Sequence, residues 1–309
     1  MAGTVWGESE TARLLYMMQR GVGSNEIAEV FRQEEDSQRT QRAIENKISR
    51  EKQNDPGAWR VQIKGGNTPQ YTGAIRATSE RTLVIADVHA PFHDAAFMNS
   101  VIGLAARLRC DTCVVAGDLV DWASFSVYGR VLGVEAAEEI ESARQIVHSI
   151  ADTFEHVIYF PGNHEDRLGR KMDHLLPITE TMGWFVDQSN VLLSEYRWCV
   201  IINGGKKWHI EHPKNTSVIP ARVPQLLCSK YLANVIMGHN HQWGITRDRS
   251  GKYYAIETGI CADPKKLDYI QRIHNTRPEV NQGAVLVLEG VPLLLSKENV
   301  KLYEKEMTA

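Results

Sequence analysis

Short apolar runs recur between residues 82 and 295 of this chain, separated by polar segments. Continuous runs of this length, rich in β-branched and aromatic residues, are typical of buried strands. Two longer stretches between them, 95–108 and 135–154, carry patterns that predict helices. The predicted strands are 82–86, 113–116, 157–160, 208–211, 234–237, 253–256, 284–288 and 292–295. Strands interleaved with helices indicate a domain in which both kinds of element share one core.

The amino-terminal part has a different period. Apolar residues at helical spacing predict helices over 8–20, from Ser24 to about Phe31, and over 40–52. Gly21 and Gly23 separate the first two helices, and Ser24 can cap the second. Glycine and proline then interrupt any period, which indicates a linker. We therefore divide the chain into a three-helix module (1–55), a linker (56–80) and a large domain (81–309).

Composition narrows the class of protein. The chain has 309 residues, 43% of them hydrophobic, and a formal net charge of −3, which suits a sizeable core and argues against a global polyanion binder. No apolar run reaches membrane-spanning length, and no basic stretch followed by an apolar one opens the chain. We expect a soluble, cytoplasmic protein with no membrane partner, whose five cysteines are free core thiols.

Candidate chemistry lies just past the predicted strands. Five strands are followed by segments with oxygen and imidazole donors, the ligand types of hydrolytic metal sites. These segments are Asp87-Val-His89, Gly117-Asp118-Leu-Val-Asp121, Gly162-Asn163-His164-Glu165, His212 and Gly238-His239-Asn-His241. One such segment is most simply a turn, because Asp, Asn and Gly favour turns. The complete set, with histidine beside the turn residue repeatedly, indicates a metal centre.

This set resembles the calcineurin-like metallophosphoesterase superfamily, whose pattern is D-x-H, G-D-x-x-D, G-N-H-[D/E], H, G-H-x-H. The resemblance covers residues 80 to 290 and implies an α+β fold, a two-sheet β-sandwich flanked by helices. It also implies two divalent metal ions. One would be bound by Asp87, His89, Asp118 and His241, and the other by Asp118, Asn163, His212 and His239. Asp118 would bridge the two ions.

The same resemblance implies that His164 stays unliganded beside the substrate and is oriented by Asp121. An imidazole titrates near neutrality, so His164 can donate a proton to the leaving oxygen of a phosphoester. The fourth segment departs from the common Gly-His and reads Glu211-His212, with His209 as a rival donor. We retain His212 as the ligand, and we expect His209 to be a packed or surface histidine.

Residues at the predicted mouth bear on the substrate. Trp122 follows Asp121 where the Ser/Thr protein phosphatase branch has arginine and glycine, which disfavours a phosphoprotein substrate. Trp122, Trp243 and Arg167 are candidates for substrate binding, since aromatic rings can stack on bases while arginine meets phosphates. The alternative is that these aromatic residues pack among themselves.

The amino-terminal module resembles a helix-turn-helix unit of the Myb-like or resolvase-like kind. Its third helix is locally basic, and the candidate DNA contacts are Arg39, Arg42, Lys47 and Arg50. The alternative is a helical appendage used for homo-oligomerisation or protein docking.

Together these features predict two-metal hydrolysis of phosphodiesters in nucleic acid, in a layout similar to bacteriophage metallophosphoesterases. Manganese is the favoured metal, with iron, zinc, cobalt or nickel as alternatives. Two rival interpretations stay open. One is a phosphatase or phosphodiesterase for small molecules, and the other is a metal-binding scaffold tethered to DNA without activity.

Overall fold

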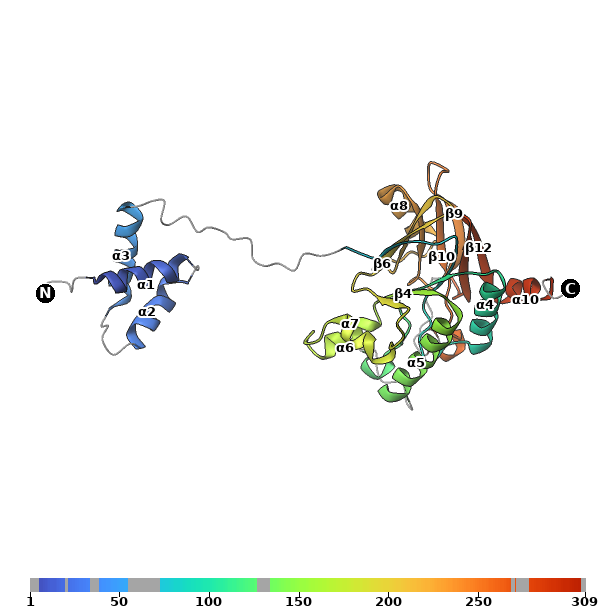
Figure 1. The fold of residues 1–309 in the computed structure, drawn as a ribbon, viewed down its shortest axis with the longest axis horizontal. Helices are drawn as coiled ribbons and strands as arrows, with labels where there is room; N and C mark the ends of the chain where they lie inside the picture. The colour runs from blue at the N-terminus through green and yellow to red at the C-terminus, as the bar shows by residue number, and fades with distance from the viewer. Residues whose placement is uncertain are drawn as a thin grey trace. The chain divides into compact units, whose positions relative to one another are not determined.

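The computed structural model describes residues 6–19, 22–33, 39–54, 73–126, 134–267, 270 and 278–306. They belong to two compact units, Met1–Thr72 and Gly73–Ala309. Figure 1 colours both units along the chain. Each unit has a core of its own, as the two different periods in the sequence predict.

The smaller unit contains three helices at the predicted places. They are α1 (Glu8–Gln19), α2 (Ser24–Gln33) and α3 (Gln41–Asn54). Their apolar faces enclose a small core of Leu14, Ile27, Ala28, Phe31 and Ile44. A partly buried ion pair adds to this core, because the guanidinium of Arg39 binds the carboxylate of Glu10 at 2.8 Å and lies over the ring of Trp6.

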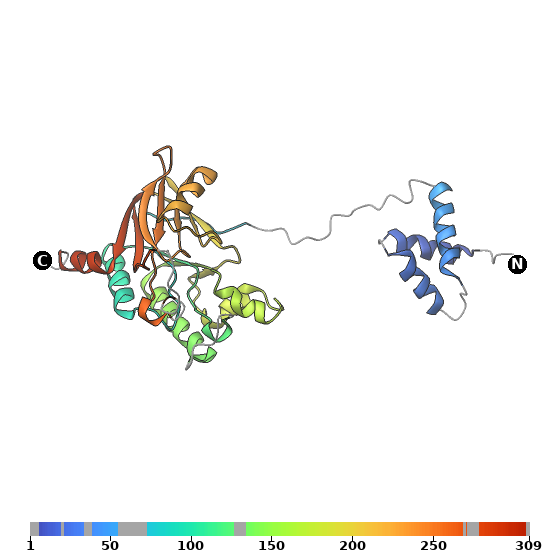
Figure 2. The ribbon, with the colours of Figure 1, turned by 180° about the vertical axis from the view of Figure 1, so that it is seen from behind.

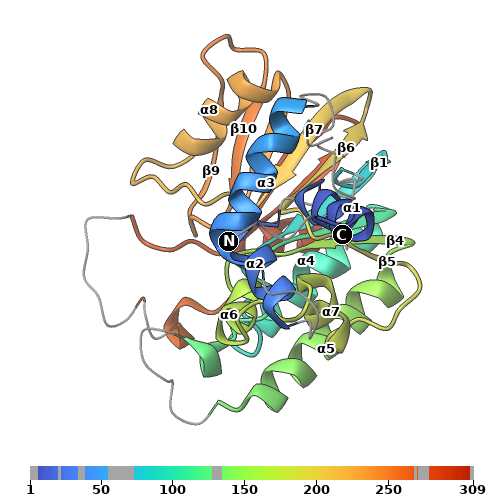
Figure 3. The ribbon, with the colours of Figure 1, turned by 90° about the vertical axis from the view of Figure 1, so that its left-hand side faces the viewer.

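The larger unit is built on two six-stranded sheets. Sheet A has the order β1-β6-β7-β8-β10-β9, and Figure 3 shows its labelled strands side by side. Its strands are β1 (Arg76–Thr78), β6 (Trp198–Asn203), β7 (Lys206–Glu211), β8 (Asn234–Met237), β9 (Trp243–Arg247) and β10 (Tyr254–Thr258). Sheet B has the order β12-β11-β2-β3-β4-β5. Its strands are β2 (Arg81–Ile85), β3 (Thr112–Ala116), β4 (His156–Phe160), β5 (Val191–Leu193), β11 (Gly283–Leu288) and β12 (Val291–Ser296).

Alternation along the sheet B strands explains the sandwich. Val84 and Ala86 belong to the core between the two sheets, whereas Leu83 and Ile85 belong to the core beneath the helices. Successive side chains of a strand point to opposite faces, so a continuous apolar run buries both faces of its sheet. The predicted two-sheet fold flanked by helices is confirmed.

Helices cover the outer faces. Helices α4 (Ala95–Arg107) and α5 (Ala136–Thr153) contribute to the helix-side core of sheet B, and α10 (Lys297–Glu306) packs on α4. In Figure 2 the red α10 lies beside the teal α4. On sheet A, α8 (Arg222–Tyr231) contacts β8 and β10. Further helices in the described part are α6 (Glu165–Lys171), α7 (Ile178–Met182) and the single turns η1 (Ala123–Phe125), η2 (Gly183–Phe185) and η3 (Pro264–Lys266).

The parallel strands bring the predicted ligand segments to one edge. Strands β2, β3 and β4 are parallel neighbours in sheet B, as are β7 and β8 in sheet A. Their carboxyl ends therefore face the same way within each sheet, which is where open sheets commonly place a site.

The predicted linker, 56–80, ends earlier than the sequence suggests. Residues 76–78 form β1, which pairs with β6 at the edge of sheet A, and residues 55–72 lie outside the described part. A three-residue edge strand has too little apolar pattern to be detected in the sequence. None of the described helices is long and apolar enough to cross a membrane.

Candidate metal centre

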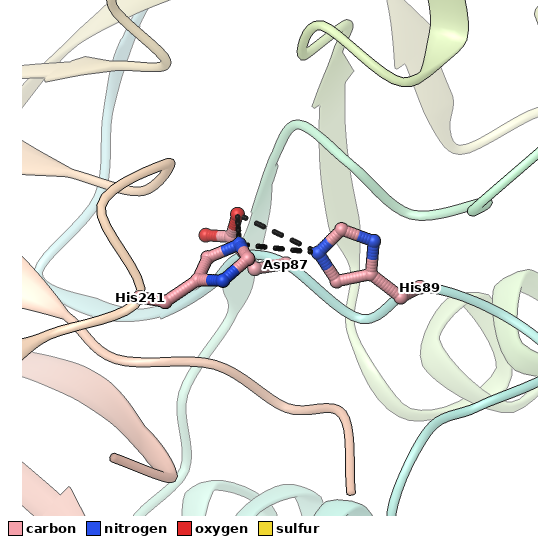
Figure 4. A group of neighbouring side chains, drawn as sticks. All are labelled: Asp87, His89 and His241. Atoms are coloured by element: carbon pink, nitrogen blue, oxygen red, sulfur yellow. Dashed lines mark hydrogen bonds and ion pairs between the residues drawn. The ribbon is translucent and has the colours of Figure 1, made fainter. Parts of the chain in front are cut away.

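The first group of predicted ligands converges on one point. Asp87 Oδ1 lies 3.2 Å from His241 Nε2, and His89 Nε2 lies 3.3 Å from the same nitrogen. Figure 4 shows the carboxylate and the two imidazoles turned toward one another. They come from loops that follow β2 and β8. One carboxylate and two imidazole donors within 4.8 Å can hold a divalent cation.

The second group contains Asp118, His212 and His239, whose donor atoms also lie within 4.8 Å. His212 Nδ1 donates to the Ala116 carbonyl at 2.9 Å, so in the neutral ring Nε2 carries the lone pair. That nitrogen lies 3.3 Å from Asp118 Oδ2 and 3.1 Å from Asn163 Oδ1. Three electron-pair donors that face one another repel unless a cation or a proton lies between them.

Asp118 reaches both groups. A further set of donors within 4.8 Å joins Asp118 to His89, a member of the first group, and to His164. The Asp118 side chain is almost fully buried, and its Oδ1 accepts a hydrogen bond from the His164 backbone N–H at 2.8 Å. Its Oδ2 faces the ligand nitrogens, which is the position that a bridging carboxylate requires.

Two buried oxygens test whether cations fit here. Asp87 Oδ1 and Asp118 Oδ2 are shielded from solvent and accept no hydrogen bond from the residues that the structure describes. A buried carboxylate oxygen without a donor is costly, and such atoms are rare in folded proteins. Divalent cations would satisfy both atoms. The residues present therefore fit two metal ions, which the seven ligands that the resemblance implies would hold.

The backbone at the ligands is strained. Asp87, His89, Asp118, His239 and His241 have φ values of 52°, 50°, 52°, 82° and 59°, in the left-handed region that residues with a side chain rarely adopt. Such conformations cost about 1–3 kcal/mol each and cluster at functional sites. This backbone conformation directs each side chain toward the metal centre.

Glycines make room for this arrangement. Gly117 has a φ of 82°, and a Cβ there would lie 2.6 Å from His212 Nδ1. A Cβ on Gly162 would collide with the Asp118 carboxylate. From the sequence, these glycines indicate tight turns. The structure shows a further reason for Gly162, which is the close approach of two ligand loops.

Glu165 joins those two loops, and sequence reasoning gave it no role. Its carboxylate accepts hydrogen bonds from the backbone N–H groups of Asp118 (3.0 Å), Leu119 (2.8 Å) and Gly162 (2.7 Å). The Tyr159 hydroxyl donates to it at 2.7 Å. Glu165 thereby fixes the loop of Asp118 to the loop of Asn163. Its place after Gly-Asn-His was the available signal.

The two imidazoles of the second group, His212 and His239, have pKa values shifted in opposite directions. Burial disfavours the charged form of His212, but the Asp118 carboxylate outweighs it and raises the His212 pKa to about 9. Burial, with the nearby His212, lowers the pKa of His239 to about 4. Without a metal, a proton on His212 occupies the space between the donors that a cation would take.

His164 lies beside both groups. Its Nδ1 donates to Asp121, 2.9 Å from both the backbone carbonyl and Oδ1, and its ring makes a T-shaped contact with that of His89. Although burial opposes ionisation, His164 and His89 hold the pKa of Asp121 far below its usual range. Burial also opposes protonation of His164, but Asp118 and Asp121 raise its pKa. The structure thus brings the predicted pair together.

Arg167 is the third member of this arrangement. It donates to the Asp121 carbonyl at 2.9 Å and to His164 Nε2 at 3.1 Å. Its side chain is 14% exposed. A guanidinium beside the imidazole can both orient that ring and meet a phosphate oxygen.

The two predicted tryptophans are part of the packing. Trp122 is 1% exposed and contacts the rings of Phe125 and Phe185 in the helix-side core. Trp243 is half-buried against the core between the sheets, and its indole donates to the Leu295 carbonyl at 3.0 Å. The buried Trp122 ring offers no stacking platform, which corresponds to the packing alternative, whereas the half-buried Trp243 stays a candidate.

His209 is a packed histidine, as expected. It stacks between Trp198 and Tyr231, with ring centroids at 4.9 and 4.0 Å, and its Nε2 lies 3.0 Å from Glu211 Oε2. Strand alternation directs it away from His212, which alone of the two joins a ligand group.

A family comparison matches this geometry. The model of the family described as calcineurin-like phosphoesterase matches residues 80–272. The chain belongs to this family. Metal-dependent hydrolysis of phosphoesters is therefore the chemistry that its site supports.

Solved structures with a similar fold are distant. A variant of Vps29 from Entamoeba histolytica is 15% identical, with a TM-score of 0.36, and the match covers 70% of this chain and 97% of that one. YfcE, a phosphoesterase from E. coli, is 13% identical (TM-score 0.37; 67% and 87%). A dimetal phosphatase from Danio rerio is 11% identical (TM-score 0.34; 70% and 98%). Among curated proteins, no sequence matches this chain.

Proposed function

We propose that this protein uses two divalent cations, with manganese as the first to test, to hydrolyse phosphodiester bonds in nucleic acid. The metal centre supports the reaction class, and the smaller unit supports the choice of substrate. Small-molecule phosphoesters remain the rival substrates, and the experiment below separates the two.

The observation that carries the proposal is the solvent-facing side of α3. Ile44 faces the core of the smaller unit, whereas the opposite side of the helix exposes donors and acceptors that read base edges or meet phosphates. The exposed residues of α3 are Gln41, Arg42, Glu45, Asn46, Ser49, Arg50, Gln53 and Asn54. A recognition helix entering the major groove presents a face of this kind.

The four candidate DNA contacts of this unit have unequal surroundings. Arg39 is 9% exposed and holds α1 through Glu10, and Lys47 pairs with Glu51 at 2.8 Å. Arg42 and Arg50 are exposed. Contact with DNA would therefore rest chiefly on Arg42 and Arg50, while Arg39 and Lys47 also stabilise the unit.

The residues of the larger unit have distinct parts in hydrolysis. Two bound cations supply a nucleophile at neutral pH and charge that stabilises phosphate oxygens. In the neutral ring, Nδ1 is the donor to Asp121 and Nε2 accepts from Arg167; when the ring is protonated, His164 Nε2 carries the proton that the leaving oxygen needs. Burial opposes this protonated form, but Asp118 and Asp121 raise the pKa of His164 and so favour it. Arg167 adds a positive charge beside His164 Nε2, where it can hold a phosphate oxygen.

Matched chromogenic substrates test the proposal. The full chain is incubated with manganese and either bis-p-nitrophenyl phosphate or p-nitrophenyl phosphate, in parallel with single- and double-stranded DNA. We expect hydrolysis of the diester and of at least one DNA form. Hydrolysis of the monoester alone would contradict the nucleic-acid proposal but leave the metal centre intact. If no phosphoester is hydrolysed, the proposal that this protein is an enzyme would be contradicted.

A further inference from the structure

A basic pocket lies at the end of sheet A opposite to the ligands. It has a volume of about 300 Å³ and forms where β7, β8 and β10 begin and β9 ends. Four of its lining residues are cationic, namely Lys206, Lys207, Arg247 and Lys252. No carboxylate is among the lining residues in the described part of the chain. In a protein whose net charge is −3, this is a local concentration of positive charge.

Arg247 is held in place by a stack of rings. Its guanidinium carbon lies 3.5 Å from the centroid of the Tyr254 ring, and Tyr254 stacks on the buried Trp208 at 5.9 Å with an interplanar angle of 14°. One N–H donates to the Lys252 carbonyl at 3.4 Å. An arginine fixed in this way loses little freedom when it binds, so it is prepared for a phosphate.

The lysines differ in their roles. Lys206 Nζ donates to the Gly290 carbonyl at 2.9 Å and thereby fixes the turn between β6 and β7. Lys207 and Lys252 are exposed, and neither pairs with a carboxylate among the described residues. The pocket thus presents two exposed ammonium groups to a ligand.

The two acidic residues near the pocket have hydrogen-bond partners other than its lysines. The Asp248 carboxylate is turned inward and accepts hydrogen bonds from the backbone N–H groups of Ser250 (3.1 Å) and Tyr253 (2.9 Å). Glu289, next to the β6–β7 turn, is paired with Arg81 at 2.6 Å. Among the described residues, Lys207 and Lys252 thus have no carboxylate partner, and the pocket offers their ammonium groups to an anionic ligand.

We propose that this pocket binds the backbone phosphates of a polynucleotide, as an accessory site for the strand that the metal centre cleaves. The proposal rests on the proposed function. The cations come from three separate strand ends, which suits successive phosphates better than one small anion. Strand β7 has six residues, so roughly 20 Å separates its first residue from the ligand that follows it. Only a polymer could occupy both places.

The test measures binding without hydrolysis. A fluorescent oligothymidylate of roughly 20 nucleotides, longer than the 4–16 nucleotides of typical single-strand sites, is titrated with the full chain in EDTA at several salt concentrations. The variant is Lys207→Ala/Lys252→Ala. The control is Lys301→Ala/Lys305→Ala, which removes the same charge from exposed positions on α10.

We expect the pocket variant to bind about tenfold more weakly near 0.1 M salt, with a salt slope reduced by about 0.7 per lysine. The control should change affinity less than twofold. Affinity and slope equal to those of the control would overturn the proposal. Loss of inorganic phosphate binding with unchanged oligonucleotide affinity would also overturn it, since the pocket would then serve a free anion.

Turnover of bis-p-nitrophenyl phosphate separates this inference from the proposed function. Both double variants should hydrolyse this small diester like the wild type, because the substituted lysines lie far from the metal ligands. A protein that cleaves no diester but loses oligonucleotide affinity in the pocket variant would contradict the proposed function and support the pocket. Cleavage of the diester with unchanged oligonucleotide affinity in the pocket variant would support the proposed function and contradict the pocket.

Discussion

The metal centre and α3 both present polar side chains, but under opposite physical conditions. At the centre the carboxylates of Asp87 and Asp118 are buried, have oxygens without hydrogen bonds and sit on left-handed backbone. On α3 the polar side chains are exposed on an ordinary helix. Burial and strain lower the stability of the fold, so they indicate a function that compensates them. Exposed polar residues carry no such cost.

This contrast explains why the two regions support conclusions of different strength. Few arrangements other than a metal centre would retain the buried donors, whereas a polar helix face suits DNA, protein or solvent equally well. The two regions should also respond differently to substitution. Changes at the centre should alter catalysis by orders of magnitude, and changes on α3 should alter binding alone.

Asp118→Asn should have the largest effect. The substitution removes the charge that both ligand groups share, so we expect activity on bis-p-nitrophenyl phosphate to fall by about 10⁴-fold, or roughly 5 kcal/mol. Metal content, measured by elemental analysis, should fall as well. Asp248→Asn, a buried carboxylate that holds a turn, serves as the control and should retain both metals. Full metal content in Asp118→Asn would contradict its bridging position.

His164→Ala should lower turnover by about 10²–10³-fold while metal content stays unchanged, because the imidazole moves a proton and binds no metal. Elemental analysis and steady-state kinetics on the same sample provide the two measurements. His174→Ala, an exposed histidine just after α6, is the matched control. Loss of both metals from His164→Ala would show that it is a ligand instead.

The metal-free protein should lose stability as the pH rises from about 6.5 to about 9. Protonated His212 has a folded pKa of about 9, above the ordinary value of 6.5, so its stabilisation is complete below pH 6.5 and disappears through pH 9. The loss is on the order of 3 kcal/mol, at about 1.4 kcal/mol for each pH unit between 6.5 and about 9. The raised pKa of His164 acts in the same direction.

Thermal unfolding of EDTA-treated protein across this pH range is the measurement. With manganese bound, the cation replaces the His212 proton, and the decline should disappear. A melting temperature that rises between pH 6.5 and 9 without metal would contradict the role of His212.

Arg167→Ala should reduce turnover of diesters by about tenfold, in keeping with the loss of one charge-assisted hydrogen bond. It should also shift the pH profile of kcat, because Arg167 contacts His164 Nε2. Arg167→Lys retains the charge but not the two hydrogen-bond donors of the guanidinium, so its turnover should lie between those of the wild type and Arg167→Ala. An unchanged pH profile in Arg167→Ala would leave the residue a packing role only.

Arg42→Ala/Arg50→Ala should have the smallest effect. We expect DNA affinity to fall by less than about tenfold and the salt slope by about 1 per arginine. Hydrolysis of bis-p-nitrophenyl phosphate should not change, since the small diester needs only the metal centre. The control Glu8→Gln changes an exposed residue of α1. Unchanged DNA affinity in the double arginine variant would favour docking or oligomerisation.

Much of the larger unit could be predicted because its chemistry and its strands are continuous in sequence. Apolar runs marked β2, β3, β4, β7 and β8, and the ligands follow each of them directly. Even the uncertain choice of His212 over His209 agrees with strand alternation, which places His209 between two aromatic rings.

Other features could not be predicted because they depend on partners distant in sequence. Glu165 acts through backbone groups of Asp118 and Leu119, more than forty residues earlier, and nothing local indicates those bonds. Trp122 and Trp243 were placed at the mouth because of their neighbours in sequence, whereas tertiary packing decides that they are buried or half-buried. The basic pocket likewise joins residues from separate turns.

Cleavage of DNA by the full chain tests the central claim most directly. A labelled oligonucleotide is incubated with manganese and wild-type protein, His164→Ala or Asp118→Asn, and the products are separated by length. We expect the wild type to cleave the strand, His164→Ala to cleave it slowly with both metals bound, and Asp118→Asn to leave it intact. An intact oligonucleotide with wild-type protein that carries both metals and hydrolyses p-nitrophenyl phosphate would contradict the claim.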